Sequence, residues 1–373
     1  MNRETKRLIT LISILCMGGT MLKSQTLRDG KLFDPGTRMA NRAETAPAEL
    51  DKMSFYIGQW DVEFEVFQQD TVSASGVAKA TVTYMNRGHS IMERLHAPDF
   101  SGGKGLNTLT FLAWNTANKQ WNLGEANSFT ESISVYNGDF EDDVLTLKNG
   151  VRRRGGIQMT LFKRTIEKES TDAFSISENV STDYGKTWQK SMIKKYKRRR
   201  HDENFMAGSG KFGEVAPGLL EEAREFDFLL GVFSANQELT FPNGQVAKFP
   251  STTTAVRALN GHAIMEFNWY DVDPRLPDAA TTIIRIYNRA MRRWESLYMT
   301  NRGNGCLFFG GKKEGDRIVL TQFEANAADS PMSFYIFHDA QKDSYKWFAN
   351  TSFDGGKTFQ KTWIIEMQRQ ESN

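Results

Sequence analysis

Apolar and polar residues alternate over short stretches along most of the chain, which is the period expected of half-buried β-strands. These stretches are rich in β-branched and aromatic residues and are separated by turn residues, as strands of antiparallel hairpins are. Two other segments, residues 47–56 and 218–230, instead predict short helices. Closely spaced strands with tight turns predict an all-β antiparallel meander rather than alternating strands and helices. The clearest strand stretches are residues 80–85, 90–95, 108–114, 174–180, 281–287, 317–323 and 332–337.

The strand pattern occurs twice. The segment GHSIME at residues 88–93 returns as GHAIME at residues 261–266, an offset of 261 − 88 = 173. Near the end of each copy, STDYGKTWQK at residues 181–190 returns as SFDGGKTFQK at residues 352–361, an offset of 352 − 181 = 171. Ordered matches at nearly constant spacing indicate a duplicated domain. Further matches at the 173-residue offset are Gly58 with Gly231, Trp60 with Phe233, Trp114 with Tyr287 and Trp121 with Trp294.

The repeat and the composition of the segments around it predict the domain layout. The two copies are separated by a stretch rich in glycine and charge, which predicts a linker. The polar segment before the first copy predicts a flexible stretch. The predicted layout is a signal peptide at 1–25, a flexible segment at 26–46, barrel 1 at 47–199, a linker at 200–217 and barrel 2 at 218–370.

The repeated segment near the end of each copy has the chemistry of a hairpin lock. An aspartate in it can accept hydrogen bonds from the backbone amides that follow, and a glycine supplies the left-handed residue of a tight turn. The next aromatic residue begins the outgoing strand. The segment looks like the Asp box of sialidase propellers, but two copies are too few for propeller blades. The residues assigned to this structural role are Asp183, Gly185 and Trp188, and Asp354, Gly356 and Phe359.

Each copy resembles the lipocalin-like (calycin-type) barrels, and more narrowly a bacterial lipocalin-like domain family of unknown function. The resemblance is carried by FYIGQW at residues 55–60 and FLLGVF at 228–233, by WNTANKQW at 114–121 and YNRAMRRW at 287–294, and by the two hairpin locks. It implies a fold of two tandem antiparallel β-barrels, each preceded by a short helix and packed side by side. It also implies that Trp60 and Phe233, next to Gly58 and Gly231, plug the closed ends. Asn115 and Asn288 stand where that family has aspartate.

A barrel of this size leaves room for one small ligand, so each interior is the default site. Strict alternation places His89 and Glu93 on one face of their strand, and His262 and Glu266 repeat this. If that face lines the interior, the side chains can orient a ligand, act as acid and base, or bind a metal. The alternative is that they satisfy each other or a neighbouring strand. One histidine and one glutamate per copy fall short of a metal ligand set, so neither a metal nor a cofactor is expected.

Aromatic residues beside the hairpins are a second group of candidates. Trp114, Trp121, Tyr287 and Trp294 are either a pocket wall for an apolar, aromatic or sugar ligand or ordinary cross-strand packing. Trp269 precedes a proline-rich loop, and it is predicted to form part of the rim around the open end of the second barrel. Because the first copy has a different loop there, the two copies are not expected to bind the same molecule equally well.

Charge and cysteine content narrow the class of protein. The formal net charge of +2 over 373 residues gives no global field for nucleic acid. The basic run at 194–201 is predicted to end the last strand of the first copy and enter the linker, and it is interpreted as solvated rather than as a nucleic-acid contact. The basic residues before the apolar run 8–17 predict a signal peptide, and hence a periplasmic or secreted protein. A lipid anchor at Cys16 is the competing interpretation, disfavoured by the bulky Leu15. With Cys16 removed, Cys306 is alone, so no intrachain disulfide is expected.

Taken together, these observations predict an exported tandem barrel protein that binds a small apolar or aromatic molecule in its cavities. One alternative is a cofactor-independent isomerase, hydratase or lyase acting in a barrel or in the cleft between barrels. Another is an accessory sugar-binding protein of a polysaccharide-utilisation system. No phosphate loop, nucleophile elbow or dinucleotide fingerprint is present in the sequence.

Overall fold

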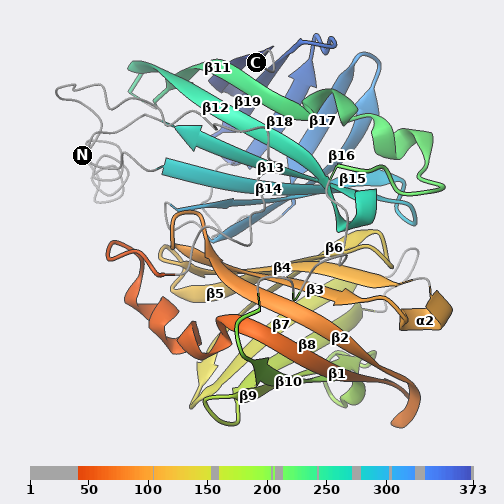
Figure 1. Cartoon of the computed structure of the whole chain (residues 1–373). Coiled ribbons are helices and arrows are strands. Elements are labelled where there is room, and N and C mark those ends of the chain that lie inside the picture. Colours follow the sequence, from red (N-terminus) through yellow and green to blue (C-terminus); the bar gives the residue numbers. More distant parts are fainter. Residues whose placement is uncertain are drawn as a thin grey trace.

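The computed structural model describes residues 41–103, 105–152, 159–202, 205, 213–241, 243–270, 279–301, 305–323 and 332–370, and over these ranges the chain forms two closed antiparallel barrels of ten strands each (Figure 1). In each barrel every strand pairs with its neighbours in the chain, and the first strand pairs with the last. The predicted all-β meander, made twice, is therefore confirmed.

Barrel 1 begins with the 3-10 helix η1 (Ala48–Tyr56), and a one-turn helix, α2 (Phe100–Gly103), lies between its third and fourth strands. Its strands are β1 (Gly58–Gln68), β2 (Thr71–Met85), β3 (Ser90–Ala97), β4 (Leu106–Asn115), β5 (Gln120–Asn127), β6 (Ser132–Glu141), β7 (Val144–Arg152), β8 (Met159–Lys168), β9 (Ala173–Ser181) and β10 (Gln189–Arg199).

Barrel 2 begins with two short 3-10 helices, η2 (Glu221–Arg224) and η3 (Asp227–Leu229), and carries η4 (Leu259–Gly261) before its third strand. Its strands are β11 (Gly231–Thr240), β12 (Val246–Ala258), β13 (Ala263–Tyr270), β14 (Ala279–Asn288), β15 (Arg293–Thr300), β16 (Cys306–Glu314), β17 (Arg317–Gln322), β18 (Met332–His338), β19 (Ser344–Ser352) and β20 (Gln360–Arg369).

The two barrels share one strand register. Glu93 lies opposite Val82 in barrel 1, and Glu266 lies opposite Ala255 in barrel 2, so both partners are displaced by the same 173 residues. From β8 and β18 onward the equivalent positions are 171 residues apart. Because side chains alternate between the two faces of a sheet, a shared register puts equivalent residues on the same face. Positions in the two interiors can therefore be compared one by one.

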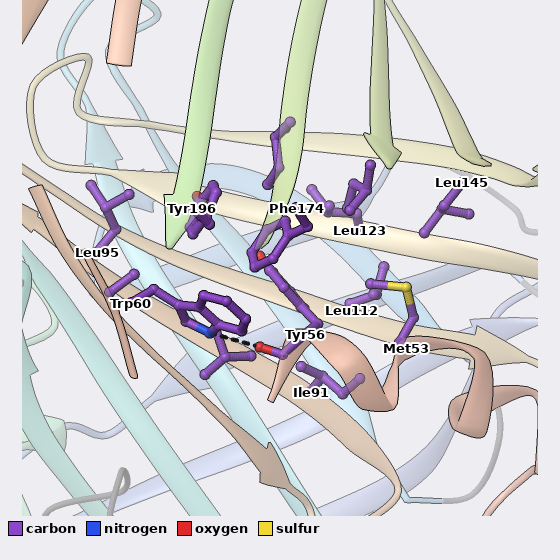
Figure 2. Packing of buried hydrophobic residues seen from close by; sticks show 14 of the residues in the cluster. Met53, Tyr56, Trp60, Ile91, Leu95, Leu112, Leu123, Leu145, Phe174 and Tyr196 are labelled. Atoms are coloured by element: carbon purple, nitrogen blue, oxygen red, sulfur yellow. Dashed lines mark hydrogen bonds between the residues drawn. The ribbon is translucent and has the colours of Figure 1, made fainter. Parts of the chain in front are cut away.

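The closed end of barrel 1 is filled by an aromatic plug (Figure 2). The indole Nε1 of Trp60 donates to the backbone oxygen of Tyr56 at 2.9 Å, which ties β1 to the end of η1. The rings of Trp60 and Phe174 meet edge to face at 4.7 Å. Arg198 lies over the Trp60 ring at 4.1 Å and donates to the backbone oxygen of Ile57. Helix, first strand and last strand are thus joined at one point.

Barrel 2 repeats this closure with different side chains. Phe233 takes the place of Trp60 and is fully buried. Arg369 lies over its ring at 4.5 Å and donates to the backbone oxygens of Leu230 and Phe228. The basic run at 194–201 was predicted to end the last strand of the first copy and enter a solvated linker. Its first residues do end β10, as predicted. The solvated interpretation is wrong for Lys194, which is buried, and for Arg198, the matching closure residue of barrel 1.

The barrels pack side by side through the outer faces of their sheets (Figure 1). Gly124 on β5 approaches Leu297 on β15 so closely that a Cβ at Gly124 would overlap the leucine. The backbone N–H of Ile133 donates to Glu295 at 2.9 Å, and Thr282 donates to Asn86 at 2.7 Å. A shared apolar cluster surrounds these contacts; it includes Met92, Phe111, Met265, Ile284 and Cys306.

Cys306 lies within this interface. Burial raises the pKa of its thiol to about 12. Among the described residues it is the free cysteine, and its backbone N–H donates to Asn122 of barrel 1. No helix in the described ranges is long and apolar enough to cross a membrane.

Candidate functional site in the barrel interiors

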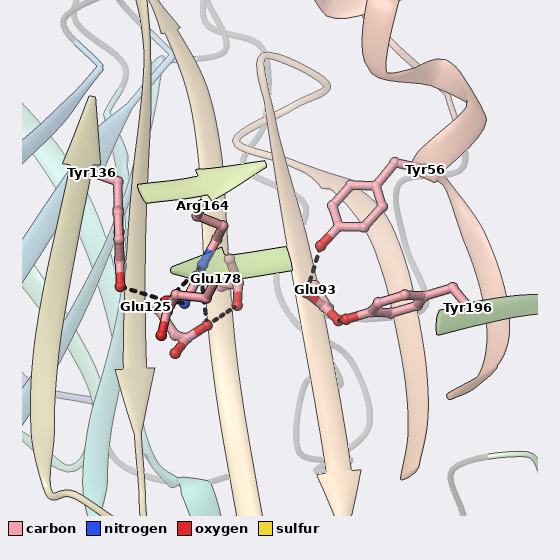
Figure 3. A network of polar contacts seen from close by, with 8 residues as sticks. Tyr56, Glu93, Glu125, Tyr136, Arg164, Glu178 and Tyr196 are labelled. Carbon is pink, nitrogen blue, oxygen red and sulfur yellow. Dashed lines mark hydrogen bonds and ion pairs between the residues drawn. The ribbon is translucent and has the colours of Figure 1, made fainter. Parts of the chain in front are cut away.

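Two groups of hydrogen-bonded polar side chains lie inside barrel 1 (Figure 3), next to the apolar core cluster. The first is centred on Glu93 of β3, whose side chain is almost fully buried. Tyr56 from η1 donates to one carboxylate oxygen at 2.5 Å, and Tyr196 from β10 donates to the other at 2.7 Å. Each oxygen of this buried carboxylate is thus satisfied by a tyrosine hydroxyl, as a charge out of water requires.

The second group is centred on Arg164 of β8 and lies nearer the end of the barrel opposite the plug. Its guanidinium donates to Glu125 at 2.9 Å and to Glu178 at 2.8 Å and 3.2 Å. Tyr136 donates to the same Glu178 oxygen at 2.9 Å, and the Arg164 guanidinium lies 4.5 Å from its ring centre. Thr110 donates to Glu125 at 3.3 Å. These five side chains come from five different strands.

Burial and charge act against each other in this group. Burial by itself would raise the pKa of Glu125, but Arg164 and Lys194 outweigh it and lower that pKa to about 2. Burial would likewise lower the pKa of Arg164, yet Glu125, Tyr136 and Glu178 raise it well above its ordinary value. For Tyr136, burial raises the pKa, and Glu178 adds to the rise. Glu125 and Arg164 are therefore charged, and Tyr136 is neutral, at physiological pH.

This balance predicts a pH dependence of folding. The pKa of Glu125 is lower in the folded protein than its ordinary 4.5, so the unfolded chain binds more protons between the two values. The contribution of Glu125 to the free energy of unfolding is therefore fully present above pH 4.5. It is lost as the pH falls from 4.5 to about 2. Urea unfolding at a series of pH values measures it. If the free energy of unfolding of a Glu125→Gln variant fell with acid pH as steeply as that of the original protein, the expectation would be contradicted.

Barrel 2 keeps the first glutamate but surrounds it differently. Glu266 pairs with Arg285 at 2.5 Å and accepts from Asn268 at 2.9 Å. The tyrosines that hold Glu93 in barrel 1 are replaced at the equivalent positions by Leu229 and Met367. An arginine on the neighbouring strand therefore does for Glu266 what two hydroxyl groups do for Glu93.

The charged group around Arg164 has no counterpart in barrel 2. The residues at the equivalent positions are uncharged, and most are aromatic. Tyr335 replaces Arg164, and its ring stacks on Phe309 at 4.1 Å. Trp347 meets Tyr335 at 4.9 Å and Trp363 at 5.6 Å, both edge to face. The substituted positions are Tyr298 for Glu125, Phe309 for Tyr136, Tyr335 for Arg164, Ala349 for Glu178 and Ile365 for Lys194.

The aromatic wall of barrel 2 is not completely covered. Tyr298, Tyr335 and Trp363 face inward by strand register, yet each is only partly buried. Trp363 donates through Nε1 to Gln237 at 2.8 Å, which fixes its ring. Although they face inward, these three side chains therefore remain accessible to solvent.

The histidines do not join the interior glutamates. His89 lies in the turn before β3, where its ring contacts Thr45 and the backbone oxygen of Arg87, both at 3.1 Å. His262 follows η4 and contacts Glu131 of the other barrel at 3.1 Å. The expectation that each histidine shares the inner face with its glutamate is therefore wrong. Left-handed residues at Arg87 and Gly88 end the alternation before the strand begins.

The predicted aromatic candidates lie toward the closed ends. Trp114 and Trp121 are cross-strand partners whose rings meet at 5.8 Å, and Tyr287 and Trp294 repeat this at 5.7 Å. Trp294 is fully buried against Phe226 of the 3-10 segment. Of the two interpretations, this geometry favours cross-strand packing. The side chain of Trp269 lies outside the described residues.

The hairpin locks close the turns between the last two strands of each barrel. Asp183 accepts from the backbone N–H of Thr187 at 2.9 Å and from its hydroxyl at 2.6 Å. Asp354 accepts from Thr358 in the same way, at 2.9 and 2.7 Å. These bonds lower the pKa of both aspartates, that of Asp354 to about 2. The turn glycines have the expected left-handed φ, 83° at Gly185 and 87° at Gly356.

Sequence reasoning missed the Arg164 group. Its members come from separate strands and share no motif, and only Thr110 and Glu178 lay in stretches singled out as strands. One signal was present: once the two copies are aligned, these positions carry charge in the first copy and aromatic or aliphatic groups in the second. A charged residue at an inward position of only one copy indicates a partner elsewhere in that interior.

Outside the barrel interiors, neither a surface groove nor a group of metal-binding residues provides a stronger candidate site. An open groove of about 850 Å³ lies at the closed end of barrel 2, lined by Phe228, Lys313, Phe337 and Lys342 among others. Its charged side chains are of both signs and include Glu225, Lys313, Asp316 and Lys342. In the described part of the chain, no three histidine, cysteine, aspartate or glutamate residues are grouped so as to hold a metal ion.

Comparison with known proteins adds a weak likeness of shape. No family model and no curated protein matches the sequence. A DUF3598-family protein of unknown function from Nostoc punctiforme matches with 9% identity and a TM-score of 0.25, covering 87% of this chain and 100% of that one. Rv2717c of M. tuberculosis matches with 14% identity and a TM-score of 0.31, over 42% of this chain and 99% of its own.

A third solved structure, transferrin binding protein B of Haemophilus parasuis, has 7% identity and a TM-score of 0.18, with 84% of this chain and 76% of that chain covered. At such scores none of these likenesses carries a statement about function.

Proposed function

We propose that the protein binds a small, mostly apolar or aromatic molecule in the interior of barrel 2. The supporting observation is the group of inward aromatic side chains, Tyr298, Tyr335 and Trp363, that remain partly exposed. Their neighbours Phe309 and Trp347 are buried behind them. Aromatic walls with a few fixed polar groups are the usual lining of small-molecule sites.

The polar groups of this interior favour an uncharged ligand. The Glu266 and Arg285 charges neutralise each other, and Gln237 is occupied by Trp363 and Ser251. A flat apolar molecule could stack on Tyr335 or meet Trp363 at its edge, contacts of about 0.5–1.5 kcal/mol each beyond the area they bury. Barrel 1 has charged groups at the equivalent positions, so it would not take the same molecule.

The first experiment is native mass spectrometry of the protein purified from its own host, which detects a retained small molecule. The measured mass of the protein also shows whether its N-terminus has been cleaved or modified. Loss of residues 1–25 would support export to the periplasm or the medium, and an added lipid at Cys16 would support membrane anchoring instead. Both locations are proposals drawn from the sequence.

A binding test in vitro uses 2-naphthol as a neutral aromatic probe. We expect saturable quenching of tryptophan fluorescence in the original protein, because Trp347 and Trp363 line the interior. Ala349→Leu adds bulk beside them and should weaken binding by about tenfold or more, at a stability cost of about 1–3 kcal/mol. Lys346→Leu introduces the same side chain on the exposed face of the same strand and should bind normally.

Two results would refute the proposal. One is the absence of saturable quenching in the original protein. The other is equal binding by Ala349→Leu and Lys346→Leu, once thermal melts show that both variants are folded.

A further inference from the structure

Lys194 is a buried cation inside barrel 1 that has no partner of its own. It lies on β10 between Tyr196 and Met192, faces inward by strand alternation, and is only 4% exposed. Within the described residues, its ammonium makes no hydrogen bond and no ion pair, although its charge helps to lower the pKa of Glu125. Its nitrogen is not among the fully buried side-chain atoms that lack a partner, so its three donors remain open to water or to a ligand.

Two acceptors in the same interior are also unused. Glu125 and Glu178 each receive their hydrogen bonds on one oxygen, Oε2, from Arg164, Thr110 and Tyr136. In the described part of the chain, no group donates to the Oε1 atom of either residue. Carboxylate oxygens have lone pairs for further donors, so these atoms are free to accept.

The sign of the interior charge restricts what can enter. Among the described side chains of barrel 1, the buried charged residues are three glutamates, one arginine and one lysine, a formal net charge of −1. A carboxylate ligand would meet Lys194 but would add repulsion from Glu125 and Glu178. A neutral molecule with hydroxyl groups can accept from Lys194 and donate to the free carboxylate oxygens without adding charge.

Apolar residues flank this polar group. Val66 of β1 and Phe162 of β8 are partly buried against the core, on strands adjacent to those of Lys194 and Glu178. Partly covered aliphatic and aromatic surfaces of this kind suit the C–H faces of a polyol ring.

We propose that barrel 1 contains a second binding site, for an uncharged polyhydroxylated molecule of the polyol or sugar class, with Lys194 donating to a ligand oxygen and Glu125 and Glu178 accepting from ligand hydroxyl groups. This site is independent of the aromatic site in barrel 2. It differs from that site in charge, in hydrogen-bonding capacity and in the residues that form it.

The test is isothermal titration calorimetry of the full chain with D-glucose, myo-inositol and D-gluconate at pH 7. We expect at least one of the two neutral polyols to bind and gluconate, which adds a negative charge, to bind more weakly by about tenfold. If neither of the two neutral polyols binds, the proposal is overturned. Gluconate binding as tightly as the neutral polyols would also overturn it.

A matched pair of variants locates the site. Lys194→Met removes the buried donor while keeping the length of the side chain, and should weaken polyol binding by about tenfold to a hundredfold. Lys195→Met makes the same change at the exposed neighbour and should leave binding unchanged. Equal affinity of the two variants would place the polyol elsewhere. Lys194→Met should also leave 2-naphthol binding intact, which keeps failure of this site distinct from failure of the one in barrel 2.

Discussion

Replacing Arg164 with methionine is expected to lower the free energy of unfolding by about 3–5 kcal/mol. The change removes the cation that pairs with Glu125 and Glu178, both of which lie inside barrel 1. Two buried carboxylates would then remain without the cation that forms their ion pairs, which costs far more than the pairs themselves contribute. Urea unfolding at neutral pH, followed by circular dichroism, measures the loss.

The control restores neutrality. In the triple variant Arg164→Met, Glu125→Gln, Glu178→Gln, no uncompensated charge from the group remains, and most of the lost stability should return. This is the pattern that barrel 2 has adopted, since its equivalent positions are Tyr335, Tyr298 and Ala349. A single variant that loses less than about 1 kcal/mol would show that the ion pairs are not desolvated.

Replacing Trp60 with alanine is expected to cost about 3–5 kcal/mol. Trp60 is fully buried at the closed end, contacts Phe174 and donates to the backbone oxygen of Tyr56 (Figure 2). Its ring also lies under the guanidinium of Arg198. Its removal leaves a cavity and frees η1 from β1. Thermal and urea unfolding both measure the effect.

Two further substitutions serve as a parallel test and a control for this result. Phe233→Ala removes the equivalent plug of barrel 2 and should cost a comparable amount. Trp188→Ala removes a partly exposed tryptophan that lies under Lys163 near the hairpin lock, and should cost about 1 kcal/mol or less. If Trp60→Ala and Trp188→Ala were equally mild, the plug would not stabilise the barrel.

Much of the fold follows from local patterns. The predicted strand stretches all lie within or across observed strands, and the helix predicted at 47–56 forms as η1. The helix predicted at 218–230 forms as two shorter turns, η2 and η3. These features depend on residues close together in the chain, where side-chain period and turn chemistry act directly.

The candidate site was predictable only in part. Alternation along β3 and β13 correctly placed Glu93 and Glu266 on the inner faces. It failed for His89 and His262, because each belongs to the turn before its strand and the period of two does not extend through a turn. Trp114 and Trp121 were placed on a hairpin, but the end of the barrel at which that hairpin lies depends on closure of the whole sheet.

By itself, the sequence determined that this protein is a β-meander made twice, since the period of two and the constant offset are visible in one dimension. The tertiary structure alone decided which inward charges meet. Arg164 lies 39 residues from Glu125, and Tyr196 lies 103 residues from Glu93. Such pairs form across the interior when the first strand closes on the last, and the stagger of that closure is set by the packing of the whole barrel.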